Sequence, residues 1–378
     1  MKVVRTLAAP ALALALALVV SAVVLQLSGN APGDILDVIA KQGFTVRSAV
    51  ATSNRAAPYY LAGVAVAIGF KMNLFNIGVE GQYRVAALVA AGAGAAVHLP
   101  APLHVAVVLI AAMAVGMAWA AIAGILRARR GVSEVISTIM LNAIAFGVTP
   151  YLLERFFRAP KANAADYAKV TRTIAPSGRL PTLDPVLRAV GIDPPQGTSL
   201  GSFVFVAVAV GVAYYVVVWR TRFGFDLRAT GSNPSAARAS GVDARRMIIT
   251  AMALSGAVAG LVGLSRILND TGYYSADVVV RGLGFTGIAV ALLGRNHPVG
   301  IAFGALLWAF MDVLQTPLAR AELPKEIVAI MQGTIVLSVV VAYEVVRRIA
   351  QRQEAATIAR QDPPLTSGAT PAPTPASA

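Results

Sequence analysis

An acidic side chain, two amides and two glycines interrupt an otherwise apolar region at Phe75–Gln82 (FNIGVEGQ). The segments on both sides are apolar enough to lie in a lipid bilayer. Ionisable and amide groups at membrane depth cost free energy, so they usually line a path or a binding site instead of facing lipid. Glycines that interrupt hydrophobic segments are also typical of transporter cores. The region therefore predicts a protein that moves a solute across a membrane.

The composition indicates a membrane protein and argues against a nucleic-acid partner. The chain is 57% hydrophobic and 13% charged, whereas soluble domains are about 25% charged. Its net charge of +14 is spread between apolar segments and is not gathered in one basic domain. This distribution favours cytoplasmic loops that follow the positive-inside rule. The chain has no cysteine, which excludes disulfides, thiol catalysis and cysteine-based metal sites.

The spacing of apolar segments predicts an all-α polytopic membrane protein with about ten transmembrane helices. The expected spans are Leu7–Leu27, Pro58–Phe70, Asn76–Val97, Pro102–Leu126, Val132–Leu153, Ser202–Trp219, Met247–Ile267, Gly284–Gly294, Pro298–Pro317 and Ile327–Tyr343. Two of them, Pro58–Phe70 and Gly284–Gly294, are shorter than the roughly 17 residues that a crossing needs. One short span in each half of the chain predicts broken helices.

The arginine clusters predict the orientation of these spans. With ten crossings, the basic residues before the first span, after the fourth, between the sixth and seventh, and after the tenth all fall on one side. That side is the cytoplasm, so both termini are expected inside. The predicted organisation is a membrane domain over residues 1–350, with an extracytoplasmic loop at 154–200 and a cytoplasmic segment at 221–246. Residues 351–378 are expected to be a disordered cytoplasmic tail, and Asp34–Val50 a short amphipathic helix at the outer interface.

The fifth span carries polar residues on one helical face. By the spacing i, i+3, i+4, i+7 and i+8, that face holds Glu134, Ser137, Thr138, Leu141 and Asn142. A polar ladder from the cytoplasmic edge toward the midplane fits a path for the solute. The alternative is structural, with Ser133 capping the helix, Glu134 favouring its positive end, and Asn142 bonding a neighbouring helix.

A second candidate group surrounds the junction of the second and third spans. It consists of Asn73, Asn76, Glu80 and Gln82. An unwound backbone there would expose its amides and carbonyls toward a cavity, so these residues predict part of the solute's path. In the alternative, Glu80 only favours a helix N-terminus or pairs with Arg84 one turn further on.

The long cytoplasmic segment contains a predicted docking helix. A turn at Gly231–Asn233 is followed by a short helix, Pro234–Ser240, which has proline at its first position and is stopped by Gly241. Small residues in this helix suit insertion into a groove on a partner protein. The alternative is a solvated loop whose arginines only fix the topology.

Sequence signatures of an enzyme are missing. The chain has no Gly-x-x-x-x-Gly-Lys-Ser/Thr loop for ATP, and its three histidines have no carboxylates at ligand spacing. No catalytic residue, metal or cofactor is therefore expected. The small residues of Ser255–Gly263 predict close helix packing and no site.

Four motifs together resemble one family: FNIGVEGQ, Glu134–Asn142 (EVISTIMLN), Arg228–Gly241 (RATGSNPSAARASG) and Gly287–Gly300 (GIAVALLGRNHPVG). From about Pro58 to Tyr343 the chain resembles permease subunits of ATP-binding-cassette importers for nucleosides and simple sugars, a group that belongs with the ribose and branched-chain amino-acid permeases. The resemblance implies a multi-pass protein of the inner membrane that works by alternating access.

The resemblance also implies separate partner chains: an ATPase subunit, a second homologous permease that makes a heterodimer, and an extracytoplasmic solute-binding protein. The first two motifs would border the solute's path. The short cytoplasmic helix would couple to the ATPase through Gly231, Asn233, Pro234, Ala236, Ala237, Arg238, Ser240 and Gly241.

Two other classes compete with this interpretation. An ion-coupled secondary transporter would need no ATPase, but no span carries the Asp–His or Asp–Lys pairs that such coupling often uses. A membrane-embedded enzyme would need a nucleophile or a metal cluster, and the sequence has no cysteine and no histidine with carboxylates at ligand spacing.

Overall fold

A computed structural model describes residues 32–160, 168–324 and 326–361, together with isolated positions between residues 19 and 29. The described residues form helices joined by loops and by isolated β-bridges, without strands. The predicted all-helical class is therefore confirmed. The chain divides into two compact units, residues 25–332 and residues 1–24 with 333–378. The first unit contains the polar motifs named above and is described below.

The elements of the first unit follow one another along the chain with short connections. They are α2 (Pro32–Val38), η1 (Ile39–Gly43), α3 (Val46–Phe70), α4 (Val79–Ala96), α5 (Ala101–Arg130), α6 (Glu134–Leu152), η2 (Leu153–Phe157), η3 (Pro176–Gly178), α7 (Asp184–Ala189), α8 (Phe203–Arg220), α9 (Arg222–Ser232), α10 (Pro234–Ala239), α11 (Ala244–Leu261), η4 (Val262–Leu264), η5 (Ile267–Thr271), α12 (Leu283–Leu293) and α13 (Pro298–Arg320). The last helix, α14 (Glu326–Gln361), begins in this unit and continues into the second.

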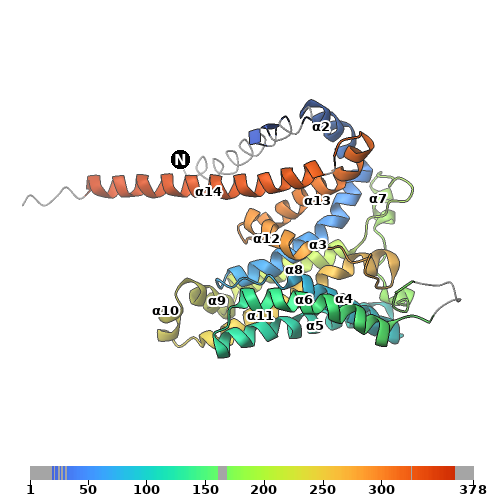
Figure 1. Cartoon of the computed structure of the whole chain (residues 1–378), viewed down its shortest axis with the longest axis horizontal. Coiled ribbons are helices and arrows are strands. Elements are labelled where there is room, and N and C mark those ends of the chain that lie inside the picture. Colours follow the sequence, from blue (N-terminus) through green and yellow to red (C-terminus); the bar gives the residue numbers. More distant parts are fainter. Residues whose placement is uncertain are drawn as a thin grey trace, which may run out of the picture. The chain divides into compact units, whose positions relative to one another are not determined.

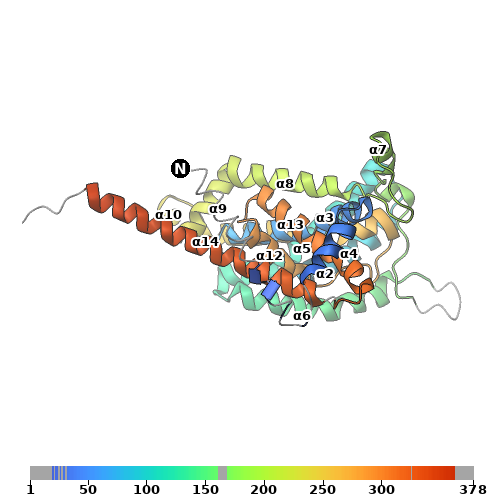
Figure 2. The ribbon, with the colours of Figure 1, turned by 90° about the horizontal axis from the view of Figure 1, so that it is seen from above.

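Helices α3 and α4 form the buried centre of the first unit. Nearly every α3 residue from Ala56 to Gly69 is buried, and α4 is buried from Val79 to Leu88. Helix α3 packs against α8, α11, α12 and α13, while α4 packs against α5, α6 and α11. Figure 2 shows α8 along one side of the unit and α6 along the other. A helix buried on all sides is a core element and not an amphipathic surface helix.

The helices around this centre are more apolar than the centre itself. Within the described parts of the chain, five helices are long and apolar enough to cross a membrane: α5, α6 with η2, α8, α11 with η4, and α13. In the most apolar window of α5 only 22% of the residues are buried, against 72% for α11. Apolar side chains therefore cover the outside, while charged and amide groups lie inside, which is the arrangement that lipid demands.

The structure corrects one expected span and the expected interfacial helix, and it confirms the short length of another span. Helix α3 is continuous from Val46 and contains Pro58, so the short span Pro58–Phe70 is the inner part of a helix of 25 residues. The expected interfacial helix Asp34–Val50 is instead α2, then η1, then the start of α3. Helix α12 has 11 residues, about 16 Å, and is too short to cross, as predicted.

The remaining span predictions are only partly covered. The first span, Leu7–Leu27, lies outside the described residues except for isolated positions. Helix α14 continues to Gln361, beyond the expected start of the tail at residue 351, and residues 362–378 lie outside the described chain. The total of ten crossings stays a prediction.

The two ends of the long helices differ in character. Figures 1 and 2 place α9 and α10 at one end and α7 at the other. Leu227 of α9 belongs to one apolar cluster with Ala123 of α5 and Leu141 of α6. The arginines that end α5 and those of segment 221–246 therefore lie at the same end, as the positive-inside rule requires of a cytoplasmic face.

The loop after α6 packs onto the opposite end. The Ile174 amide donates to the Gly272 carbonyl at 2.7 Å, and the Leu180 amide donates to the Leu268 carbonyl at 2.9 Å. His104 is fully buried, with its Nε2 atom 2.7 Å from the Gly94 carbonyl oxygen. These bonds attach the described parts of the loop to η5 and to the outer ends of α4 and α5.

Close contact between α5 and α11 depends on glycine. A Cβ atom placed on Gly256 would overlap the Gly116 carbonyl oxygen and the Ala120 side chain. A Cβ atom on Gly260 would overlap the Ala112 carbonyl oxygen in the same way. The small residues predicted for packing in Ser255–Gly263 thus let the two backbones meet.

Replacing Gly256 with alanine should destabilise the purified protein by about 2 kcal/mol, because the added methyl group overpacks a backbone contact. Thermal unfolding in detergent measures the change. Gly147→Ala in α6 is the matched control, since a Cβ atom there meets nothing within 4 Å. Equal melting temperatures for the two variants would contradict the packing described for α5 and α11.

Candidate functional site

The first polar motif forms an unwound junction between the two central helices. Helix α3 ends at Phe70 and α4 begins at Val79, and the residues between them form turns and extended backbone. Asn73 takes a left-handed conformation with φ of 55°. Non-helical backbone is tolerated at membrane depth only where protein or a cavity covers it. The predicted unwound junction is present, but protein side chains satisfy its polar groups where a cavity was expected.

Asn76 and Gln82 form a closed amide pair. The Asn76 Nδ2 atom donates to Gln82 Oε1 at 3.0 Å and to Ser255 Oγ at 2.8 Å, while Gln82 Nε2 donates to Asn76 Oδ1 at 2.8 Å. Ser255 in turn donates to the Ala65 carbonyl at 2.6 Å. Both amides are at most 1% exposed. The pair ties the junction to α11 and α3 and stabilises the unwound backbone between the helices.

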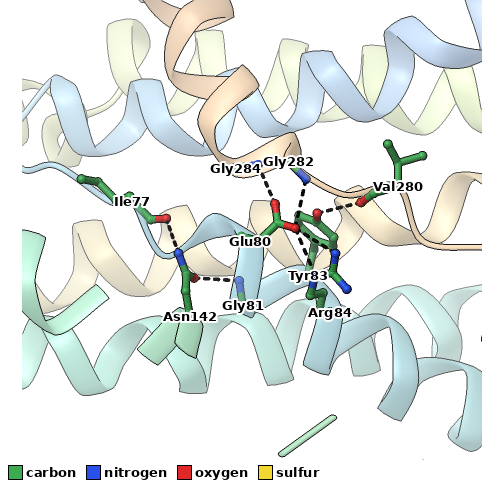
Figure 3. Close-up of polar contacts among 9 residues, drawn as sticks. All are labelled: Ile77, Glu80, Gly81, Tyr83, Arg84, Asn142, Val280, Gly282 and Gly284. Atoms are coloured by element: carbon green, nitrogen blue, oxygen red, sulfur yellow. Dashed lines mark hydrogen bonds and ion pairs between the residues drawn. The ribbon is translucent and has the colours of Figure 1, made fainter. Parts of the chain in front are cut away.

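Asn142 holds the same junction from the side of α6. Its Nδ2 atom donates to the Ile77 carbonyl at 2.9 Å, and its Oδ1 atom accepts the Gly81 amide at 2.8 Å (Figure 3). The two bonds match the two ends of the carboxamide, so asparagine satisfies one donor and one acceptor of the backbone at once. The predicted alternative, in which Asn142 bonds a neighbouring helix, is confirmed.

The other residues of the α6 face are also buried. Ser137 and Thr138 donate their hydroxyl protons to the carbonyls one turn back, at 3.0 Å and 2.7 Å respectively. Glu134 lies 3.3 Å from Arg127, and its other oxygen accepts the Phe75 amide at 3.4 Å. The five residues predicted to share a face do so. Ser133 occupies the N-cap position, but its side chain makes no capping hydrogen bond, so that expectation was wrong.

The Glu80 side chain links the junction to α12 through hydrogen bonds. Its carboxylate accepts two hydrogen bonds from Arg84, both at 3.0 Å, and one each from the Gly282 and Gly284 amides, both at 3.1 Å (Figure 3). Those two amides open α12, whose N-terminus favours a negative charge. The two predicted alternatives for Glu80 are therefore both present: it pairs with Arg84, and it lies at a helix N-terminus, although that helix is α12 and not its own.

Arg84 completes the buried pair from the other side. Its guanidinium lies over the Phe146 ring, 4.8 Å from the centroid. The neighbouring Tyr83 donates its hydroxyl proton to the Val280 carbonyl at 2.8 Å, just before α12. A Cβ atom on Gly284 would lie 2.9 Å from the Glu80 amide nitrogen, so glycine is required for this approach. Together these contacts lock α4 to the start of α12.

The predicted coupling segment contains the short helix α10. Helix α10 starts as expected: Asn233 Oδ1 accepts the Ser235 and Ala236 amides, each at 3.0 Å, and Pro234 is its first residue. Gly241 follows it with φ of 84°. The turn expected at Gly231–Asn233 is instead the end of α9, which continues to Ser232.

Two predicted groups meet at Gly231. Asn73 Nδ2 donates to the Gly231 carbonyl at 3.2 Å, and a Cβ atom on Gly231 would overlap the Lys71 carbonyl oxygen. Asn73, predicted for the solute's path, therefore lies at the segment predicted for coupling. Lys71 sits over the Trp219 ring, and burial, together with the Arg228 and Arg295 charges, lowers the pKa of its ammonium group.

Most of α10 is open to a partner. Ala237 is buried, with 3% exposure, whereas Pro234, Ala236, Arg238 and Ser240 are exposed. The helix thus packs onto the protein through Ala237. Its small side chains and one arginine are exposed, and the helix lies at the end of the unit (Figure 1).

Asp312 was missed by the sequence reasoning. It lies in the middle of the apolar helix α13 and accepts hydrogen bonds from the Tyr59 hydroxyl, from Gln315 Nε2 at 3.0 Å and from Gln332 Nε2 at 3.2 Å. Arg55 approaches the carboxylate to 3.8 Å. A single aspartate in an otherwise apolar span is a signal that hydropathy averages conceal, and such residues mark functional candidates.

Comparison with known proteins identifies relatives over most of the chain. Residues 48–340 match the family model described as the permease component of the branched-chain amino acid transport system. The guanosine ABC transporter permease protein NupP of Bacillus subtilis is 36% identical over 296 residues, covering 78% of this chain and 81% of NupP. The glucose ABC transporter permease protein TsgB13 of Haloferax volcanii is 34% identical over 290 residues, covering 75% and 73%.

A further guanosine permease from the same bacterium is a more distant relative. NupQ of Bacillus subtilis is 24% identical over 275 residues, covering 70% of this chain and 80% of NupQ. No solved structure matches the chain significantly.

Removing the negative charge of Glu80 should destabilise the fold. Glu80→Gln leaves the Arg84 guanidinium buried without its counter-charge, which costs about 3–5 kcal/mol. Thermal unfolding and the yield of folded protein in detergent measure the loss.

The chain offers a matched control in a second pair with the same spacing. Glu154 and Arg158 are also four residues apart, but the Glu154 side chain is 48% exposed, so Glu154→Gln should cost only about 0–1 kcal/mol. Equal destabilisation by the two substitutions would show that the Glu80 bonds do not hold the core.

Proposed function

Because this chain belongs to the family of permease components of the branched-chain amino acid transport system, we propose that it is the membrane-spanning subunit of an ATP-binding-cassette importer for nucleosides or simple sugars. The observation that supports this best is the identity of 36% and 34% to permeases named for guanosine and glucose over most of their lengths. The protein is a multi-pass component of the plasma membrane and is not itself an enzyme.

The proposed solute has the chemistry that both relatives' solutes share. Guanosine and glucose are neutral and carry a ring with vicinal hydroxyl groups. Such a solute is recognised by neutral or charge-balanced groups that donate and accept hydrogen bonds. The polar side chains inside this membrane domain are amides, hydroxyls and carboxylate–guanidinium pairs, which fits that chemistry.

The proposed partners supply what the chain lacks. The sequence has no phosphate-binding loop, so ATP would be bound and hydrolysed by a separate ATPase subunit that docks on α10. An extracytoplasmic solute-binding protein would deliver the solute to the opposite face. Two guanosine permeases of one bacterium, NupP and NupQ, both resemble this chain, which supports a second, homologous permease as its partner.

The geometry suggests how movement at α10 would reach the core. A shift of α10 and α9 is transmitted at Gly231 to Asn73 and to the end of α3. From there the junction connects to α4, α6 and α11 through Asn76, Gln82 and Asn142, and Glu80 links it to α12. In this proposal the predicted pathway residues Asn73, Asn76, Glu80, Gln82, Ser137, Thr138 and Asn142 move with the helices that border the solute's path.

ATP-dependent uptake by the reconstituted complex tests the function. Proteoliposomes that contain the permease pair and the ATPase should accumulate guanosine or glucose only when ATP and a matching solute-binding protein are supplied. Accumulation driven by a proton or sodium gradient, without ATP and without an ATPase, would instead identify an ion-coupled carrier and reject the proposal.

Ala236→Arg should uncouple the permease from its ATPase, because a long side chain on α10 blocks insertion into a groove. We expect at least about a tenfold fall in ATP-dependent uptake and in ATPase co-purification. Ala236 is exposed, so the thermal stability of the permease itself should not change.

Val190→Arg provides the control at the opposite end of the molecule. Val190 is 67% exposed and follows α7, and its replacement should leave ATPase binding unaltered. If the ATPase co-purified normally with the Ala236→Arg protein, α10 would not be the docking element.

A further inference from the structure

The membrane domain contains two polar clusters that differ in how fully their groups are used. In the cluster at the junction, the side chains of Asn76, Glu80 and Gln82 are at most 5% exposed and hydrogen-bonded to other parts of the protein. The second cluster surrounds Asp312 and joins α3, α13 and the start of α14. Its members are Arg55, Tyr59, Asp312, Gln315 and Gln332.

The second cluster has hydrogen-bonding groups without partners in the described chain and is here called open. The first cluster, whose groups bond to other parts of the protein, is called closed. The Arg55 side chain is 51% exposed and makes no hydrogen bond in the described part of the chain, although it lies 3.8 Å from Asp312. A guanidinium has five N–H donors. Gln315 and Gln332 each bond Asp312 through the amide nitrogen. Their amide oxygens have no partner among the described residues. Donors and acceptors are therefore available side by side.

The depth of the cluster indicates that its exposed side does not face lipid. Arg55 is nine residues from Val46, the first residue of α3, or about 14 Å below the outer end of that helix at 1.5 Å per residue. An arginine that faced lipid at this depth would be strongly unfavourable. On α13, Asp312 lies about 180° around the helix from the lipid-type residue Phe303, which is 70% exposed. The open side of the cluster therefore faces protein or water.

Further polar groups lead from the cluster to the extracytoplasmic end. Thr52 lies one turn before Arg55, and its hydroxyl is buried without a partner in the described chain. Ser48, one turn earlier again, donates to the Gln42 carbonyl at 2.6 Å. Gln42 lines a cavity of about 230 Å³ between η1 and the outer end of α13, together with Pro317 and Arg320. The polar stripe of α3 thus runs from this cavity down to Asp312.

We propose that Arg55 and Gln315, held in place by Asp312, form a contact site for the vicinal hydroxyl groups of the solute in the outer half of its path. This rests on the proposed function. Arg55 donates to the hydroxyl oxygens, and the Gln315 amide oxygen accepts a hydroxyl proton. Asp312 balances the arginine charge, so the site is neutral overall and suits a neutral solute. Asp312 and Tyr59 are positioning residues in this arrangement.

The test is discrimination between a solute and its deoxy analogue. In the complete transporter, with ATPase, second permease and solute-binding protein, initial uptake of guanosine is compared with that of 2′-deoxyguanosine. A parallel arm compares glucose with 2-deoxyglucose, and it distinguishes a nucleoside site from a hexose site. Because the solute-binding protein is the same in every assay, a change in the ratio between variants belongs to the permease.

Arg55→Gln should reduce the preference for the hydroxylated solute by about tenfold, the lower range for a hydrogen bond to a charged group. Gln315→Leu should reduce it as well, and it serves as the second variant if Arg55→Gln does not assemble. Arg188→Gln is the matched control, because Arg188 lies in the outer loop with its side chain 65% exposed, and it should leave the ratio unchanged.

Three results would overturn the proposal. Equal losses for the hydroxylated and deoxy solutes would make the cluster structural. The Arg55→Gln protein could fail to associate with the second permease while Gln315→Leu leaves the uptake ratio of hydroxylated to deoxy solute unchanged. That result would make Arg55 an ion-pair partner of the second permease. A wild-type complex that imports neither solute class with ATP would refute the proposed function, which is a different failure from an unchanged ratio in an active transporter.

Discussion

The bonds of the buried Glu80 carboxylate connect the parts of this membrane domain that the chain keeps far apart. Glu80 lies in the first turn of α4, pairs with Arg84 one turn later, and accepts two backbone amides that lie about two hundred residues further along the chain. A charge in a region of low dielectric must be paired and hydrogen-bonded to be tolerated. This requirement fixes where α12 begins, and α12 is too short to hold a position across the membrane by itself.

The same requirement explains why two helices with charged side chains lie at the centre. Helices α3 and α4 carry Arg55, Glu80 and Arg84, and apolar helices surround them on the sides that would meet lipid. Where backbone is unwound between α3 and α4, the amides of Asn76, Gln82 and Asn142 replace the missing helical hydrogen bonds. Helix α10 packs on α9, whose Gly231 meets Asn73 of the junction. In the proposed transporter, an ATPase bound to α10 would therefore be mechanically connected to the polar core.

Local patterns predicted much of this arrangement, and contacts between distant residues account for the rest. The buried face of α6 was predicted because helical periodicity is a property of neighbouring residues. The start of α10 at Pro234 followed from the same kind of local signal. The partners of Asn142 could not be predicted, because Ile77 and Gly81 are brought to it only by the packing of α4 on α6. The length of α3 was underestimated because Arg47, Asn54 and Arg55 hide its outer half from a hydropathy pattern. Asp312 was overlooked because the apolar residues around it dominate the hydropathy of α13. No pattern in the sequence tells a closed polar cluster from an open one.

The central claim is that the cluster at Asp312 is open to water and solute, while the cluster at the α3–α4 junction is sealed. The chain has no cysteine, so single cysteines can be labelled without background by a water-soluble, membrane-impermeant thiol reagent added from outside. Cysteines at positions 55 and 315 should react, and solute should slow their reaction, while cysteines at positions 82 and 142 should stay unlabelled. Labelling at 82 and 142 that solute slows, with no reaction at 55 and 315, would contradict the claim and place the solute's path at the junction.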